Sequence, residues 1–150
     1  MSSMVPRTVA KTQKWGWGIL IVVSALLALN GVALYFISTS PATFEQDTGV
    51  PISEVRQAFP TVADHVVGEG QTISMLLASL GLLAFVVALG GYRDSPRWAW
   101  NAMWVLVGML AVFSIVFLLF ASRLDIGGFY VALAGVTLVG QLLARKGLAT

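Results

Sequence analysis

The sequence contains no cysteine and only one histidine among its 150 residues, and 11% of its residues are charged. Without cysteine the chain forms no disulfide, no thiolate metal site and no CxxC redox centre. Its net charge of +2 is too small for the basic surface that binds nucleic acid, so we expect no nucleic-acid partner. The hydrophobic fraction of 57% is far above that of soluble domains, and it indicates a membrane protein.

Four uncharged, apolar stretches are long enough to cross a bilayer, which needs roughly 20 residues in helical form. Helices are favoured because every backbone polar group inside the membrane must be satisfied within its own segment. We therefore predict an all-α fold: a four-transmembrane-helix antiparallel bundle that forms a single integral membrane domain over residues 1–150. The predicted spans are residues 15–37, 72–92, 98–121 and 126–144.

The beginning of the chain has a second interpretation. Arg7, Lys11 and Lys14 precede the first apolar run, as in a secretory signal peptide. Ser40-Pro41-Ala42 would then serve as the cleavage site. The apolar run is longer than the roughly 7–15 residues of a usual signal peptide, so we expect it to be retained as a span.

The basic residues predict the orientation. With the N-terminus inside, seven of the nine Lys and Arg residues lie in cytoplasmic segments, and only Arg56 and Arg123 lie outside. This is the bias of multi-pass proteins in a cell (plasma or inner) membrane, and it puts both termini in the cytoplasm. All five tryptophans fall near the predicted inner ends of spans, where indole rings commonly anchor a helix at headgroup level: Trp15, Trp17, Trp98, Trp100 and Trp104.

No predicted span contains an ionisable side chain, although such residues are the usual sign of chemistry inside a membrane. We therefore assign no catalytic residue, no metal site and no cofactor. The polar residues that remain are neutral: Ser24, Asn30, Ser74, Ser79, Ser114 and Thr137, with Asn101 and Gln141 near the inner ends. Asn30 stands out because its amide lies past the middle of the first span. It serves either as a hydrogen-bonding contact between helices or as an orienting group for a ligand.

Small residues at helical spacing predict close contacts between helices. One such face, on the second span, comprises Ser74, Ala78, Gly81, Ala84 and Ala88. Another, on the fourth span, comprises Gly128, Ala132 and Gly135. Both faces favour a compact bundle.

The predicted outer loop, residues 38–71, contains an apolar stripe at helical spacing: Val55, Phe59, Val62 and Val66. Because Pro60 interrupts this stripe, we predict two short helices. They would form an amphipathic cap over the outer end of the bundle, with Phe59, Val62 and Val66 facing inward.

His65 and Glu69 are four residues apart and would share a helix face, with Asp64 adjacent. They form either a weak ligand site or a solvated pair. Asn30, Phe59, His65 and Glu69 are therefore the candidate ligand-binding residues.

The segment between the second and third spans reads Tyr92-Arg93-Asp94-Ser95-Pro96-Arg97-Trp98-Ala99-Trp100. In this segment and in its architecture the chain resembles small prokaryotic membrane proteins of the DoxX-like kind. That family is functionally mixed, so the resemblance implies a four-helix fold in a prokaryotic membrane and transfers no active residue.

Two functional hypotheses follow. The first is a non-catalytic membrane protein, either an accessory subunit that contacts a partner membrane protein or a homo-oligomer. The second is a binder or carrier of a lipophilic small molecule held between the helices near Asn30. Membrane lipid surrounds the spans in both.

Overall fold

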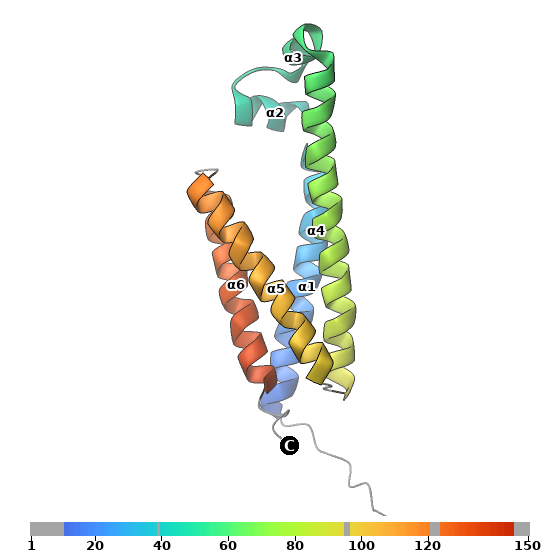
Figure 1. The fold of residues 1–150 in the computed structure, drawn as a ribbon, viewed down its shortest axis with the longest axis vertical. Coiled ribbons are helices and arrows are strands. Elements are labelled where there is room, and N and C mark those ends of the chain that lie inside the picture. Colours follow the sequence, from blue (N-terminus) through green and yellow to red (C-terminus); the bar gives the residue numbers. More distant parts are fainter. Residues whose placement is uncertain (1–10, 39, 95–96, 121–123, 146–150) are drawn as a thin grey trace, which may run out of the picture. The chain divides into compact units, whose positions relative to one another are not determined.

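The computed structural model describes residues 11–38, 40–94, 97–120 and 124–145, and all regular structure in these ranges is helical. Figure 1 follows the elements along the chain. They are α1 (Lys11–Ser38), α2 (Pro41–Thr48), α3 (Ile52–Ala58), α4 (Pro60–Asp94), α5 (Arg97–Ile115), a π-helical turn (Val116–Phe120) and α6 (Leu124–Arg145).

Four helices are long and apolar enough to cross a membrane: Lys11–Ser38, Pro60–Asp94, Arg97–Leu119 and Ile126–Arg145. The predicted all-α four-helix bundle is therefore confirmed. The chain divides into two compact units, one formed by residues 1–24 with 84–150 and the other by residues 25–83.

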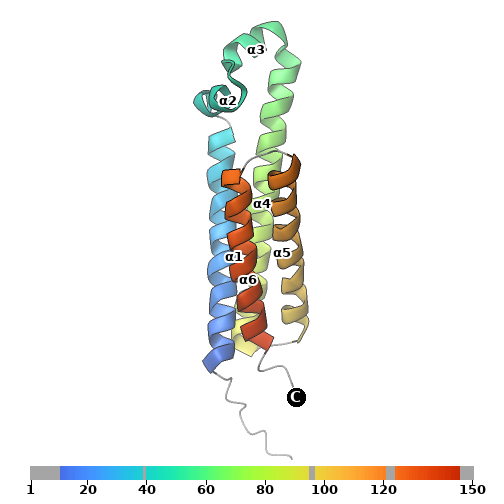
Figure 2. The same cartoon turned by 90° about the vertical axis from the view of Figure 1, so that its left-hand side faces the viewer.

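In the first unit, α5 and α6 form an antiparallel hairpin (Figure 2). The π-helical turn at the end of α5 packs against α6, where a Cβ at Gly127 would lie 2.5 Å from the Leu118 side chain. An aromatic cluster closes this end of the hairpin, since the Phe117 and Tyr130 rings stack with centroids 5.6 Å apart.

The first turns of α1 pack against α6 with their backbones in contact. A Cβ at Gly16 would lie 2.4 Å from the Ala144 nitrogen and 2.7 Å from the Gly140 carbonyl oxygen. Only glycine allows this approach, which resembles the small-residue contacts common between membrane helices. The start of α1 therefore lies beside the end of α6.

In the second unit, α1 and α4 run antiparallel. Gly31 packs on the Ala78 backbone, and Gly81 packs on the Ala28 backbone. A later residue of α4 therefore contacts an earlier residue of α1, as in an antiparallel pair. The predicted small-residue face of the second span is confirmed as a packing face, because Ser74 and Gly81 are buried along it.

The predicted break at Pro60 is present, but the helix after it is not short. Proline suits the first helical position, and the Phe59 carbonyl accepts hydrogen bonds from the Val62 and Ala63 amides there. From Pro60 the helix continues without interruption to Asp94. The predicted separate helix of the cap is therefore the N-terminal extension of α4, residues 60–71.

The fourth span packs on a different face from the predicted one. Gly128, Ala132 and Gly135 are exposed, and a Cβ at Gly128 or Gly135 would meet nothing within 4 Å. The face of α6 that is buried instead comprises Tyr130, Leu133, Thr137, Gly140, Gln141 and Ala144.

Candidate functional site

The N-terminal extension of α4 carries two of the four predicted site residues, His65 and Glu69, and a third, Phe59, is the residue immediately before it. It begins beside α3, and an ion pair joins the two elements, with Arg56 Nη2 3.3 Å from Asp64 Oδ1. On the side toward α1, a Cβ at Gly70 would lie 3.0 Å from the Ser38 Cβ. Ala63 on the extension is fully buried. These contacts fix which side of the extension faces its own chain.

The apolar stripe lies on the outward side of this extension. Phe59, Val62 and Val66 have exposed fractions of 64%, 53% and 44%. The prediction that these side chains face inward is therefore wrong. The reason is that the buried side of the extension carries the small residues Ala63 and Gly70, and Gly70 allows a close approach to Ser38 of α1.

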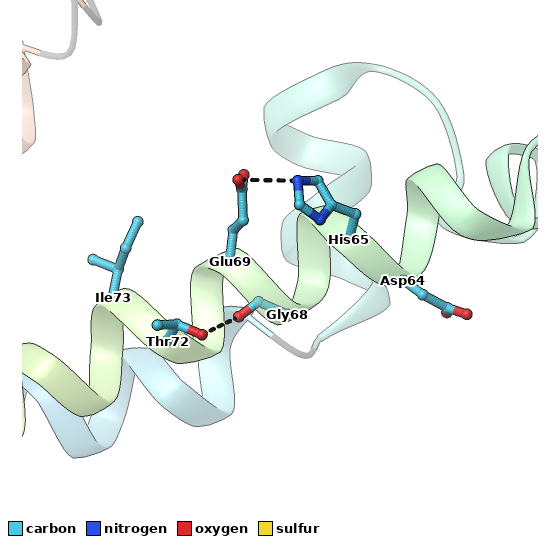
Figure 3. Close-up of a pocket in the computed structure, with 6 residues that line it drawn as sticks. All are labelled: Asp64, His65, Gly68, Glu69, Thr72 and Ile73. Atoms are coloured by element: carbon cyan, nitrogen blue, oxygen red, sulfur yellow. Dashed lines mark hydrogen bonds and ion pairs between the residues drawn. The ribbon is translucent and has the colours of Figure 1, made fainter.

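His65 and Glu69 lie beside the stripe and contact each other one helical turn apart, with His65 Nε2 3.1 Å from Glu69 Oε1 (Figure 3). Both side chains are largely exposed, so the pair contributes little to stability. Asp64 points away from them in Figure 3. The described residues accordingly include no group of three His, Asp or Glu side chains that could hold a metal ion.

A shallow, solvent-open hollow lies along this face of α4. Its lining comes from one helix only: Asp64, His65, Gly68, Glu69, Thr72 and Ile73. The hydroxyl of Thr72 donates to the Gly68 carbonyl of its own helix, so it offers little to a ligand. A hollow formed by one convex helix does not enclose a small molecule, which pockets normally surround on several sides.

The structure does not bring all four predicted site residues together. Asn30 lies half-buried on α1, next to the crossing of Gly31 with Ala78. Glu69 lies nine residues before Ala78 on α4, about 14 Å along the helix axis. Phe59 is ten residues farther again. His65 and Glu69 therefore lie near the same end of α4 as Phe59, whereas Asn30 lies on α1 beside the crossing of Gly31 with α4.

A second polar region, in the first unit, was not predicted as a site. It comprises Gln13 and Trp17 on α1 and Gln141 on α6, with exposed fractions of 2%, 0% and 0%, and we call it the Gln13–Trp17–Gln141 cluster. Gly91 of α4 allows Trp17 into this position, since a Cβ at residue 91 would lie 2.2 Å from the indole ring. Trp17 is thus a core residue, unlike Trp15, which is 65% exposed as an interfacial anchor would be.

Gln141 also ties α6 to α5. Its Nε2 donates to the Trp100 carbonyl, and the Trp100 indole Nε1 donates to the Gln141 carbonyl at 3.0 Å. Most other buried polar groups in the spans bond within their own helix. Ser74, Ser114 and Thr137, for example, donate to the carbonyl four residues earlier.

Three atoms of the cluster have no hydrogen-bond partner among the described residues: Gln13 Nε2, Trp17 Nε1 and Gln141 Oε1. Sequence patterns did not point to Gln13, because it stands between the basic residues Lys11 and Lys14 and reads as part of the polar flank of the span.

These features define the class of the protein as an all-α, multi-pass membrane protein with four candidate spans. Comparison with family models, curated proteins and solved structures finds no match to the chain. The DoxX-like resemblance therefore stays a prediction from the segment between the second and third spans.

Proposed function

We propose that this chain is a non-catalytic membrane protein that acts by contact, as an accessory subunit or as an oligomer, and that the outward face of the α4 extension is its contact surface. The observation that carries this proposal is the exposure of Phe59, Val62 and Val66 at the start of α4, whose other side packs on its own chain.

Helix length supports a contact in the aqueous layer. The uncharged part of α4, residues 70–92, extends about 34 Å and covers the roughly 30 Å hydrocarbon core, so Glu69 lies at or beyond its edge. Phe59 and Val62 lie about 15 Å and 10 Å farther along the helix axis. The headgroup layer adds only about 5–8 Å on each side. A helix close to the membrane normal would therefore hold both side chains above the lipid.

An exposed apolar stripe in water is the usual mark of a protein interface. Burying one Phe or Val side chain contributes about 1.5–3 kcal/mol, so the stripe would supply much of the affinity for a partner. The exposed pair of His65 with Glu69 would form part of a polar rim, as at most interfaces. The partner is then a protein with a complementary apolar surface, either a second copy or another membrane protein.

Site-specific cross-linking tests this proposal, because the chain has no cysteine of its own. We expect Val62→Cys, labelled in native membranes with a reagent that carries a maleimide and a photoreactive diazirine and then illuminated, to give one discrete cross-linked product. A second copy gives about twice the 16.0 kDa mass of the chain, and a different subunit gives another defined mass.

The matched control is Thr61→Cys, which is also exposed but lies off the stripe. Equal, weak cross-linking at Val62→Cys and Thr61→Cys would contradict the proposed contact surface.

We also propose that both termini lie in the cytoplasm of a cell membrane and that the α4 extension lies outside. The distribution of basic residues supports this orientation, with seven of nine on the predicted inner side. An impermeant thiol reagent on intact cells should label Gln46→Cys in α2 and should not label Ser3→Cys or Thr150→Cys. Labelling at either terminus would reverse the orientation.

The second candidate function, binding of a lipophilic small molecule, is favoured by the unpartnered polar atoms of the Gln13–Trp17–Gln141 cluster.

A further inference from the structure

The Gln13–Trp17–Gln141 cluster gathers around one helix crossing. Gly16 of α1 touches Gly140 and Ala144 of α6, the residues that flank Gln141. Gln13 is three residues before Gly16, and Trp17 is the next residue after it. All three cluster side chains therefore start within about one helical turn, roughly 5 Å, of the crossing.

The unpartnered atoms of this cluster differ in kind. Gln13 Nε2 and Trp17 Nε1 carry hydrogens and can only donate, whereas Gln141 Oε1 can only accept. None of the three reaches another protein atom within hydrogen-bond distance among the described residues. Each buried polar atom left in this state costs about 1–3 kcal/mol, and a buried Trp N–H usually has a partner.

The chemistry of the three atoms defines what would satisfy them. A carbonyl oxygen would accept from both donors but would leave Gln141 Oε1 unpaired, and an ammonium group would offer no acceptor to Gln13 and Trp17. A hydroxyl oxygen accepts two hydrogen bonds and donates one, so it alone of these groups meets all three atoms. The backbone contact of Gly16 with α6 and the packing of the Trp17 ring on Gly91 favour a small group.

We propose that this cluster binds one hydroxyl oxygen, carried by an ordered water or by a lipophilic alcohol. The oxygen accepts hydrogen bonds from the Gln13 amide and the Trp17 indole and donates one to the Gln141 amide oxygen. It links α1 to the α5–α6 hairpin through Gln141, whose amide nitrogen already bonds α5. This site is independent of the proposed contact surface on α4, so either proposal can fail without the other.

Ser24 does not belong to this site. Its hydroxyl is also buried without a partner among the described residues, but it lies seven residues beyond Trp17, about 10 Å along α1. One oxygen atom cannot reach both.

The test is nuclear magnetic resonance of the full chain, labelled with ¹⁵N-tryptophan and held in deuterated detergent. Trp17→Phe assigns the Trp17 indole N–H among the five tryptophans. We expect this proton to give a nuclear Overhauser cross-peak either to a long-lived water or to protons of a co-purified molecule. The first result identifies water as the source, and the second identifies a lipophilic alcohol, which solvent extraction and mass spectrometry would then reveal at stoichiometric amount.

Gln13→Leu supplies the second measurement. It removes one of the two donors, so we expect the Trp17 indole resonance to move and its cross-peak to weaken at least several-fold. The Trp15 indole is the internal control, because it is exposed on the same helix and should not change. Cross-peaks from the Trp17 indole to protein protons alone, unaffected by Gln13→Leu, would overturn the proposal.

Discussion

Around Trp17 the chain buries polar atoms, whereas along the first turns of α4 it exposes apolar side chains. At the first place, Gly16 brings the backbones of α1 and α6 into contact, and the Trp17 ring packs on Gly91. At the second, Val62 and Val66 project from a convex helix surface that any broad, complementary surface can cover. The two regions depart from the ordinary distribution of polar and apolar groups in opposite directions. The difference shows that local shape, as well as polarity, determines which kind of partner each region would accept.

The largest difference in stability between the two regions is expected from a substitution at the glycine contact beside the Gln13–Trp17–Gln141 cluster. Gly16→Ala places a Cβ 2.4 Å from the Ala144 nitrogen, so α1 must move away from α6. We expect the variant to lose about 1–3 kcal/mol of unfolding free energy, as other overpacked interiors do. Thermal unfolding in detergent measures this loss.

Gly18→Ala is the matched control, because a Cβ at residue 18 meets nothing within 4 Å. It should leave stability unchanged or raise it by up to about 1 kcal/mol, the difference in helix propensity between the two residues. Similar losses in both variants would mean that the backbone contact between α1 and α6 is not a principal support of the fold.

The smallest expected effect concerns the exposed apolar stripe at the start of α4. Val62→Ser changes a side chain that is 53% exposed and does not belong to the buried core of the described residues. We expect the stability of the isolated chain to change by less than about 0.5 kcal/mol, as for most surface substitutions. The same variant should reduce co-purification or cross-linking of the partner. A loss of stability comparable with that of Gly16→Ala would show that the stripe packs on its own chain.

Much of the fold was predictable because length and apolar composition decide which segments can cross a membrane. Proline chemistry also located the break at residue 60. The packing faces were only partly predictable. In the second span the small residues coincide with the buried face, whereas Gly128 and Gly135 face outward. An apolar helix in a membrane presents no polar side, so residue spacing alone cannot tell which side packs on protein.

The two candidate sites were predictable to different degrees. The pairing of His65 with Glu69 follows from their spacing, and the structure contains it. The direction of Phe59 and Val62 does not follow from spacing, because it depends on where Ala63 and Gly70 allow the chain to pack. The burial of Gln13 does not follow from the sequence, because the residue stands between Lys11 and Lys14 and the nearby contact of Gly16 with α6 joins positions more than a hundred residues apart.

The contact between Gly16 and Ala144 joins the first of the four spans to the last, and the two residues are separated by 128 positions. At a synthesis rate of about 5–20 residues per second, α6 emerges roughly 6–25 s after the start of α1. Until then the face of α1 around Gly16 lacks the helix against which it packs, although α4, whose Gly91 lies against the Trp17 indole, has already been synthesised. A chain that stops before α6 therefore lacks the contact that joins its first span to its last.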